Sequence, residues 1–256
     1  MTADGSVRAI VDALALPTGA RVDARVPKKL LIEQGAPTST DKRAIQEGVD
    51  ELQWFAACKP ATIGVPAFAD EERDYLEIAV IGCAFRAGAK GTRLIELIHR
   101  AIPYPVFLIT SDEGGLTLSA AHKRKAQNEA GRVVVEGVVA AAGLHLDGAD
   151  AMQTAFLASL ALAAQPRTDL HSLYSGWIGR LEALNASRLT GAFAATDNGE
   201  IVIRRRQALD AHAKMSKEIE VLRGKAKREK HLARRVEMNM EIQRREAELA
   251  ENSKWL

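Results

Sequence analysis

Apolar residues in the last fifty residues of the chain recur at alternating spacings of three and four. Nine positions form this seam, which is interrupted at Glu229 and Gln243: Met215, Ile219, Leu222, Ala226, Ala233, Val236, Met240, Ala247 and Ala250. Such a seam, flanked by charged residues, is typical of a coiled coil or a long helical hairpin. We therefore expect a basic coiled-coil helix over residues 204–256. A helix of this kind needs a partner, and its Ala and Met positions favour close packing over a strong zipper.

Two helices are expected near the N-terminus. A short amphipathic helix lies within residues 1–20 and ends at Pro17 and Gly19. A second helix is predicted from the N-cap residues at 39–41 to Pro60. Its apolar stripe comprises Ile45, Val49, Leu52 and Phe55.

The middle of the chain has the apolar patterns of strands. One further helix, Thr92–Ile102, is expected between the second and third of them, stopped by Pro103 and Pro105. The predicted strands are Ala61–Val65, Tyr75–Phe85, Val106–Thr110, Leu116–Ala121 and Arg132–Val139. This order predicts a mixed sheet with a right-handed crossover through the helix, if the strands on either side of it are parallel.

The predicted fold class is therefore α+β. A core domain with a mixed β-sheet and packed helices covers residues 21–150, and a helical extension over residues 151–195 follows it. The extension contains Met152–Ala164 and Leu170–Leu189 as helices. Residues 196–203 are expected to be a linker or a small hairpin, followed by the long C-terminal helix.

Composition places few further limits on the protein. An apolar content of 47% is ample for a hydrophobic core. Cys58 and Cys83 lack the spacing of a zinc site or a disulfide framework, which favours a cytoplasmic protein. The N-terminal segment lacks the cationic start of a signal peptide, and the apolar run 155–164 is too short to span a bilayer. We expect no membrane association.

Charge is distributed unevenly along the chain. Residues 204–256 carry fifteen Lys or Arg against nine Asp or Glu, a net of +6, whereas residues 1–203 carry twenty against twenty-four, a net of −4. The excess lies in seven cations opposed only by Glu229: Arg223, Lys225, Lys227, Arg228, Lys230, Arg234 and Arg235. Such a block can follow a nucleic-acid phosphate backbone, or it can pair with acids on a partner protein.

A second group of cations lies at the edges of predicted elements in the core. It comprises Lys28, Lys29, Arg100, His122, Lys123 and Arg124. These residues are candidates for one shared anion site, because phosphates are received by converging cations. Separate solvated charges are the alternative, and Arg100 also suits the C-terminal end of its helix.

Signals for an enzyme are weaker. A metal-dependent nuclease would place an acid followed by Glu-x-Lys on a central strand, but the candidate strand offers only Glu77-Ile78-Ala79. The acids within 70–74 are expected to be a solvated turn. Ser119 and His122 are close in sequence, but the alternation of a strand does not favour their meeting. We expect no cofactor and no metal ion, and we assign no catalytic residue.

Several sequence segments resemble those of a known family. They are VPKKLLIEQGAPTSTDKRAIQEGVDELQWFAACKPATIGVPAF, YLEIAV, HRAIPYPVFLI, LSAAHKR and LEALNASRLTG. Together they make residues 22–191 resemble the bacterial domain of unknown function 4391 family. The resemblance implies loci like restriction and phage-defence systems, in which such chains are encoded beside helicase-like proteins and DNA methyltransferases. It implies no established reaction and no catalytic residue.

These observations favour a noncatalytic adaptor of a DNA-processing or phage-defence complex. Its core would dock onto a helicase-like or methyltransferase subunit, and its basic helix would bind a partner or the DNA backbone. Two alternatives stay open. One is an unrecognised metal-dependent nuclease or other phosphodiester enzyme, and the other is a free-standing coiled-coil homodimer that binds DNA nonspecifically.

Overall fold

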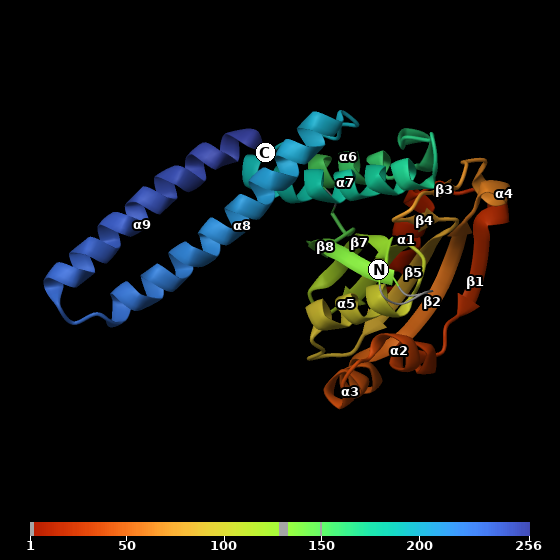
Figure 1. Cartoon of the computed structure of the whole chain (residues 1–256), viewed down its shortest axis with the longest axis horizontal. Helices are drawn as coiled ribbons and strands as arrows, with labels where there is room; N and C mark the ends of the chain where they lie inside the picture. The colour runs from red at the N-terminus through yellow and green to blue at the C-terminus, as the bar shows by residue number, and fades with distance from the viewer. Residues whose placement is uncertain (1–2, 128–132, 149) are drawn as a thin grey trace. The chain divides into compact units, whose positions relative to one another are not determined.

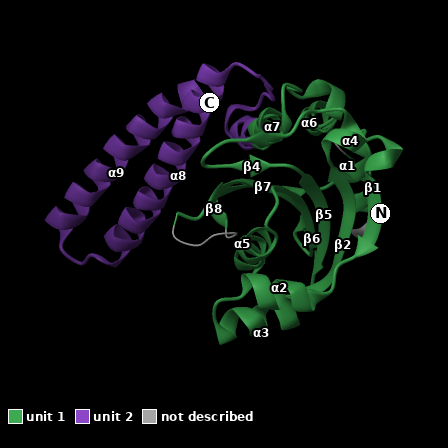
Figure 2. Ribbon diagram, turned by 45° about the vertical axis from the view of Figure 1, so that its right-hand side comes forward, with its two compact units in different colours: residues 1–181 green, residues 182–256 purple. Residues whose placement is uncertain are grey.

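The structure is a computed structural model that describes residues 3–127, 133–148 and 150–256 (Figure 1). Arg132, the expected start of the last strand, lies outside the described residues. The chain forms two compact units, Met1–Leu181 and Glu182–Leu256 (Figure 2). The boundary falls inside one continuous helix, so it differs from the segment limits expected at residues 150 and 195.

A six-stranded mixed sheet organises the N-terminal unit, in the order β1-β2-β5-β6-β7-β8. Its strands are β1 (Arg21–Arg25), β2 (Val49–Cys58), β5 (Ile78–Phe85), β6 (Val106–Asp112), β7 (Gly115–Lys125) and β8 (Val133–Leu144). Among the described strands, only β5 and β6 pair in parallel, and α5 (Gly91–Ala101) connects them, which confirms the predicted helical connection. A separate pair, β3 (Phe68–Ala69) and β4 (Asp74–Tyr75), is antiparallel.

Helices cover both faces of this sheet (Figure 2). On one face, α2 (Lys28–Gly35), α3 (Ser39–Gly48) and α5 bury a cluster that includes Leu31, Ile45 and Leu94. On the other face lie α1 (Ala3–Ala13), α6 (Ala151–Ser159) and the first half of α7 (Leu170–Thr190). There the indole of Trp177 packs on Phe107 with ring centroids 5.3 Å apart. Two covered faces explain why the central strands are apolar on both sides.

The long helix predicted from 39–41 to Pro60 is wrong in its second half, because α3 ends at Gly48 and β2 follows. Two irregularities in the pairing of β2 with β5, at Val49/Glu51 and Trp54/Ala56, account for the error. An extra residue at a β-bulge places Val49 and Leu52 on the same face although they are three apart. The apolar positions of this bulged strand therefore have the spacing that is expected of a helix.

Other boundaries also differ from the prediction. The expected strand 61–65 is instead the short helix α4 (Pro60–Ile63), which begins with proline and is capped through Thr62. The expected strand 75–85 divides between β4 and β5 at Leu76 and Glu77. The helix expected to reach Ala164 ends at Ser159, and a 3-10 turn, Leu162–Ala164, follows. Another 3-10 turn, Thr18–Ala20, precedes β1.

The C-terminal unit contains a helical hairpin. After the end of α7, α8 (Gly199–Arg228) and α9 (Leu232–Asn252) run antiparallel, and the 3-10 turn Ser253–Trp255 follows (Figures 1 and 2). Asn198 caps α8 by accepting hydrogen bonds from the backbone N–H groups of Glu200 and Ile201. The small hairpin considered for 196–203 is therefore a helix N-terminus.

The single coiled-coil helix expected over 204–256 is instead two helices, separated at Glu229–His231. The Glu229 carboxylate accepts a hydrogen bond from the backbone N–H of His231 at 2.8 Å, which stabilises the turn. Like charges four residues apart weaken a continuous helix through this stretch. The chain therefore folds back on itself and forms the long helical hairpin that the apolar seam also allowed.

Folding back changes which apolar residues of the predicted seam are buried. The α8 part is used as expected, since Ile219 and Ala226 are buried and Leu222 packs against them. In α9 the buried side is formed by Met238, Ile242 and Leu249, none of which belongs to the predicted seam. The α9 positions of that seam are all exposed: Ala233, Val236, Met240, Ala247 and Ala250.

Candidate functional site

The seven cations of the basic block gather at the closed end of the hairpin, which we call the hairpin tip (residues 223–235). It includes the last turn of α8, the connection and the first turn of α9. Seven cations against Glu229 give a net charge of +6. Residues 204–222 carry five cations and three acids, or +2, and residues 236–256 carry three and five, or −2. The excess charge of the hairpin is therefore located at its tip.

Ion pairs confirm this separation of charge. Arg223 pairs with Glu246 at 2.6 Å, and Arg245 pairs with Glu218, Glu241 and Glu248 at 3.0–3.5 Å. In the part of the chain that the structure describes, the other six tip cations have no acid within ion-pair distance. They are exposed: Lys225, Lys227, Arg228, Lys230, Arg234 and Arg235. The tip is thus a concentrated positive surface in which Arg223 is ion-paired and the other six cations are not.

The structure does not gather the cations of the core into one site. Lys28 donates a hydrogen bond to the backbone carbonyl of Val49, and Lys29 pairs with Glu33 on the surface of α2. Arg100 is exposed in the last turn of α5, where its charge suits the helix C-terminus. Lys28 and Lys29 of α2 are thus engaged within the core, and Arg100 lies on α5.

The three cations of β7 also diverge, because successive side chains of a strand point to opposite faces. The ammonium group of Lys123 is buried and donates to the backbone carbonyls of Ile102 and Tyr104. Burial lowers the pKa of Lys123 to about 7. Arg124 pairs with Glu136 on β8 at 3.5 Å. Lys123 therefore holds the chain after α5 in place and is not available to an external anion.

His122 belongs to a polar network that the sequence did not reveal. The hydroxyl of Tyr75 accepts from the backbone N–H of Lys123 at 3.3 Å and forms a second hydrogen bond with His122 Nδ1 at 2.7 Å. Nε2 of His122 lies 3.4 Å from Ser175 Oγ, and Ser175 donates to the backbone carbonyl of His171. Burial raises the pKa of Tyr75 to about 12 and lowers that of His171.

Aromatic packing encloses this network. The ring of His171 stacks on His122 and on Phe68, with centroid distances of 4.9 Å in both cases. Because the hydroxyl of Ser175 donates its hydrogen bond to a backbone carbonyl and not to a base, Ser175 is not arranged as a nucleophile. The network instead ties β4, β7 and α7 together. No sequence signal could have found it, since its members lie up to a hundred residues apart.

Ser119 bonds to another histidine. Its hydroxyl lies 3.0 Å from Nε2 of His99, which is fully buried at the end of α5. Burial, and then the charge of Lys123, lower the pKa of His99 to about 3. The expectation that Ser119 and His122 do not meet agrees with this pairing.

The acidic candidates have structural roles. Glu77 is buried beside β5 and pairs with Lys59 at 2.8 Å. Asp70 accepts hydrogen bonds from the backbone N–H groups of Glu72 and Arg73, which shapes the turn between β3 and β4. Asp74 pairs with Lys125 at 3.0 Å. Among the described residues, no three Asp, Glu, His or Cys side chains are grouped in a way that could hold a metal ion.

An apolar cavity of about 320 Å³ opens on the α2 side of the sheet. Leu30 of α2, Trp54 of β2 and Tyr104 after α5 form its walls. Leu30 and Tyr104 are themselves largely exposed, although they are large apolar residues. A partner could place an apolar side chain in this cavity.

A family model matches residues 14–249, and its description is "Domain of unknown function (DUF4391)". The chain belongs to this family. The match extends well beyond the resemblance at residues 22–191 and includes α8 and most of α9, so the hairpin is part of the family domain. Searches of curated proteins and of solved structures gave no match. Within the described residues, no helix has the length and apolar character needed to cross a membrane.

Proposed function

We propose that the protein is a noncatalytic accessory subunit of a bacterial DNA-processing or phage-defence complex, and that its hairpin tip binds the phosphate backbone of duplex DNA. The observation that carries the proposal is the set of six exposed tip cations that have, among the described residues, no acid within ion-pair distance. The complex and its helicase-like or methyltransferase subunits are suggested by the family alone. In this proposal the protein acts in the cytoplasm, where its DNA is found.

The positive charge of the hairpin tip suits this role. Lys225, Lys227, Arg228 and Lys230 end one helix and form the connection to the next, so they project from the closed end of the hairpin. Each phosphate they neutralise releases a condensed counterion, which gives sequence-independent and salt-sensitive binding. The described part of the core has no comparable surface, because its candidate cations pair with acids or carbonyls or lie apart. Its exposed apolar cavity suits the docking of a protein subunit.

The experiment is a titration of the purified chain with duplex DNA at three salt concentrations. Replacing Lys225, Lys227, Arg228 and Lys230 with Gln should weaken binding and reduce the slope of log K against log salt by up to about 3.6, at about 0.9 per phosphate contact. The matched control replaces four other exposed lysines, Lys42, Lys90, Lys214 and Lys217, with Gln. It removes the same total charge and should change the slope little.

Equal losses in the two variants would show that only net charge matters and would contradict the proposed site. If the tip variant keeps its DNA affinity but no longer copurifies with a protein from its native host, the tip binds an acidic partner instead.

The nuclease alternative has its own test. The purified chain should leave single- and double-stranded DNA and RNA intact in the presence of Mg²⁺ or Mn²⁺, since Glu77 is engaged with Lys59. Metal-dependent cleavage that disappears in Glu77→Ala would replace the accessory role with an enzymatic one.

A further inference from the structure

We propose that the apolar cavity beside α2 and the polar hollow that adjoins it bind one extended segment of a partner protein. A bulky apolar side chain of that segment fills the cavity, and an acidic side chain pairs with Arg100. The inference rests on the docking role of the core in the proposed function and states what is docked. We call the apolar cavity of about 320 Å³ the first hollow and the adjoining one of about 500 Å³ the second hollow.

The first hollow suits a large apolar side chain. Its buried lining includes Leu31, Ala79 and Ile81. Its volume is about twice that of a cavity that holds a benzene ring, so a bicyclic or branched side chain fits inside it. Two large lining residues, Leu30 and Tyr104, are 48% and 41% exposed. An inserted side chain removes this apolar surface from water, which favours binding.

Hydrogen bonds hold the walls of the first hollow in place. The indole N–H of Trp54 donates to the backbone carbonyl of Ala56 at 2.7 Å, which fixes the orientation of the ring. The ammonium group of Lys123 donates to the carbonyls of Ile102 and Tyr104, which fixes the wall after α5. Because these walls are already ordered, binding requires little further ordering of the protein.

The second hollow supplies an unpaired positive charge. The acid in its lining, Glu33, already pairs with Lys29 at 3.5 Å. The cation in its lining, Arg100, is exposed and has, among the described residues, no acid within ion-pair distance. A guanidinium group binds a carboxylate through two parallel N–H donors, so Arg100 favours an acidic side chain. The two hollows are joined, because they share three lining residues: Gln34, Ala101 and Pro103.

The extent of the joined hollows favours a polypeptide over a small molecule. The first hollow reaches β1 at Ala24 and Arg25, where Arg25 is paired with Glu51 at 3.9 Å. The second reaches the start of β8 at Val133. Since β1 and β8 are the two edge strands of the sheet, the joined hollows run from one edge to the other. A small molecule fills one hollow, whereas an extended chain, which advances about 3.3 Å per residue, passes through both.

Selection from a phage-displayed library of linear peptides, with the purified chain as bait, tests the occupant. Peptides that also bind Ala24→Phe are removed, which excludes those held by the hairpin tip. Ala24 lies opposite Trp54 in the pairing of β1 with β2, so the added ring occupies the first hollow. The remaining peptides should share a large apolar residue within about four residues of Asp or Glu, because the two hollows adjoin.

The matched control repeats the selection with Ala69→Phe in place of Ala24→Phe. Ala69 is an exposed strand residue outside both hollows, so this variant should remove every peptide that the wild-type chain binds. Recovery of no peptide after removal with Ala24→Phe, or of peptides without the apolar and acidic pair, would overturn the proposal.

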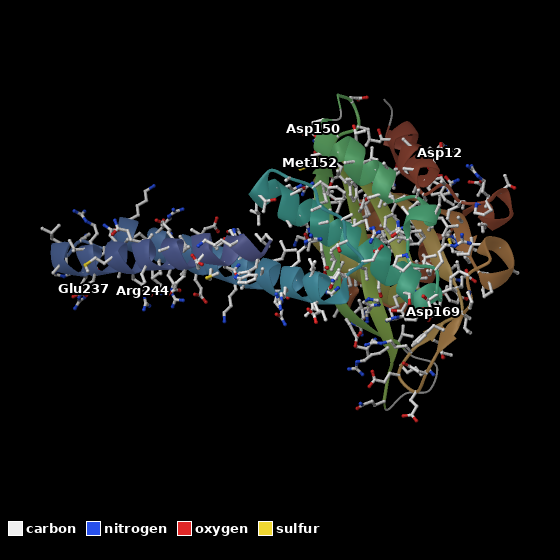
Figure 3. The ribbon with its side chains drawn as sticks, turned by 90° about the horizontal axis from the view of Figure 1, so that it is seen from above. Asp12, Asp150, Met152, Asp169, Glu237 and Arg244 are labelled. Atoms are coloured by element: carbon white, nitrogen blue, oxygen red, sulfur yellow. The ribbon has the colours of Figure 1, made fainter. Side chains whose placement is uncertain are left out.

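Charge exchange with a recovered peptide tests the second hollow. Arg100→Glu should weaken its binding by about tenfold or more, and changing the acid of the peptide to Lys should restore it. Arg21→Glu is the control, because Arg21 pairs with Asp12 at the end of α1, outside both hollows (Figure 3). It should bind the peptide as the wild-type chain does. Equal losses in the two variants, or no restoration by Lys, would contradict a pairing with Arg100.

Duplex DNA binding separates this inference from the proposed function. Ala24→Phe should bind duplex DNA as the wild-type chain does, because the tip cations lie on α8 and α9 and in their connection. DNA binding without recovery of a peptide would overturn the hollows as a docking site and leave the role of the tip intact. Peptide binding without DNA binding would support the hollows and reject the role of the tip.

Discussion

Arg223 of α8 and Glu246 of α9 form an ion pair at 2.6 Å, and this pair marks the point at which the hairpin changes character. On one side of it the acids of α9 neutralise the arginines around them. At the closed end lie the six tip cations, none of which has an acid within ion-pair distance among the described residues. The same pair joins α8 to α9 beside the apolar contacts of the hairpin.

The apolar contacts of the hairpin should be needed for its stability. Ile219→Ala removes a side chain that is 4% exposed between α8 and α9, and should cost about 2–3 kcal/mol. Val221→Ala, on the outer side of α8, should change stability by less than about 0.5 kcal/mol. Hydrogen exchange in α8 and α9 measures both effects. Equal protection in the two variants would mean that the hairpin does not depend on this seam.

The hydroxyl of Tyr75 should stabilise the contact of β4 with β7. Tyr75→Phe leaves His122 Nδ1 and the backbone N–H of Lys123 without their partner, at a cost of about 1–3 kcal/mol. Tyr104→Phe is the control, because Tyr104 is 41% exposed. Chemical denaturation compares the two. A Tyr75 variant as stable as the control would show that water replaces the hydroxyl.

Lys123 should make stability depend on pH. Its folded pKa of about 7 lies below the ordinary value of 10.5, so between these values the unfolded chain binds the extra proton and stability rises with pH. Below pH 7 both states are charged and the difference is constant. The stability of the wild-type chain relative to Lys123→Met should therefore rise by a few kcal/mol from pH 6 to pH 10. A constant difference in denaturation experiments would rule out a depressed pKa.

The segment before α8 should be the first site of proteolysis. Residues 192–198 have no regular secondary structure, and Arg205 holds the segment by donating to the carbonyl of Ala194 at 2.8 Å. Elastase, which cleaves after small residues, should cut first between Ala192 and Ala195.

Releasing the segment should speed that cut. Arg205→Gln should be cleaved faster than Arg204→Gln, because the exposed Arg204 side chain instead packs on the ring of Trp255. Mass spectrometry of the first fragments measures the site and the rate. A first cut inside α8 would show that the helix is less stable than the segment before it.

In the C-terminal hairpin, the sequence predicted some features and missed others. The heptad spacing identified helices after Arg204, and the composition identified the basic block. Neither could reveal the turn at Glu229–His231, because the break depends on packing between two segments that a linear pattern treats as one. The α9 seam was therefore predicted correctly as an apolar stripe, but its expected burial is not found within the chain.

In the core, the sequence by itself determined the α+β class, the family, the helix between the two parallel strands and four of the six strands of the main sheet, because these depend on local spacing and on glycine and proline. Only the tertiary structure decided that Val49–Cys58 is a strand, since its bulges exist only against β5. The tertiary structure also decided which groups the core cations contact. Alternation along β7 and the carbonyls after α5 direct His122, Lys123 and Arg124 to different partners, and such contacts between distant segments leave no trace in local sequence.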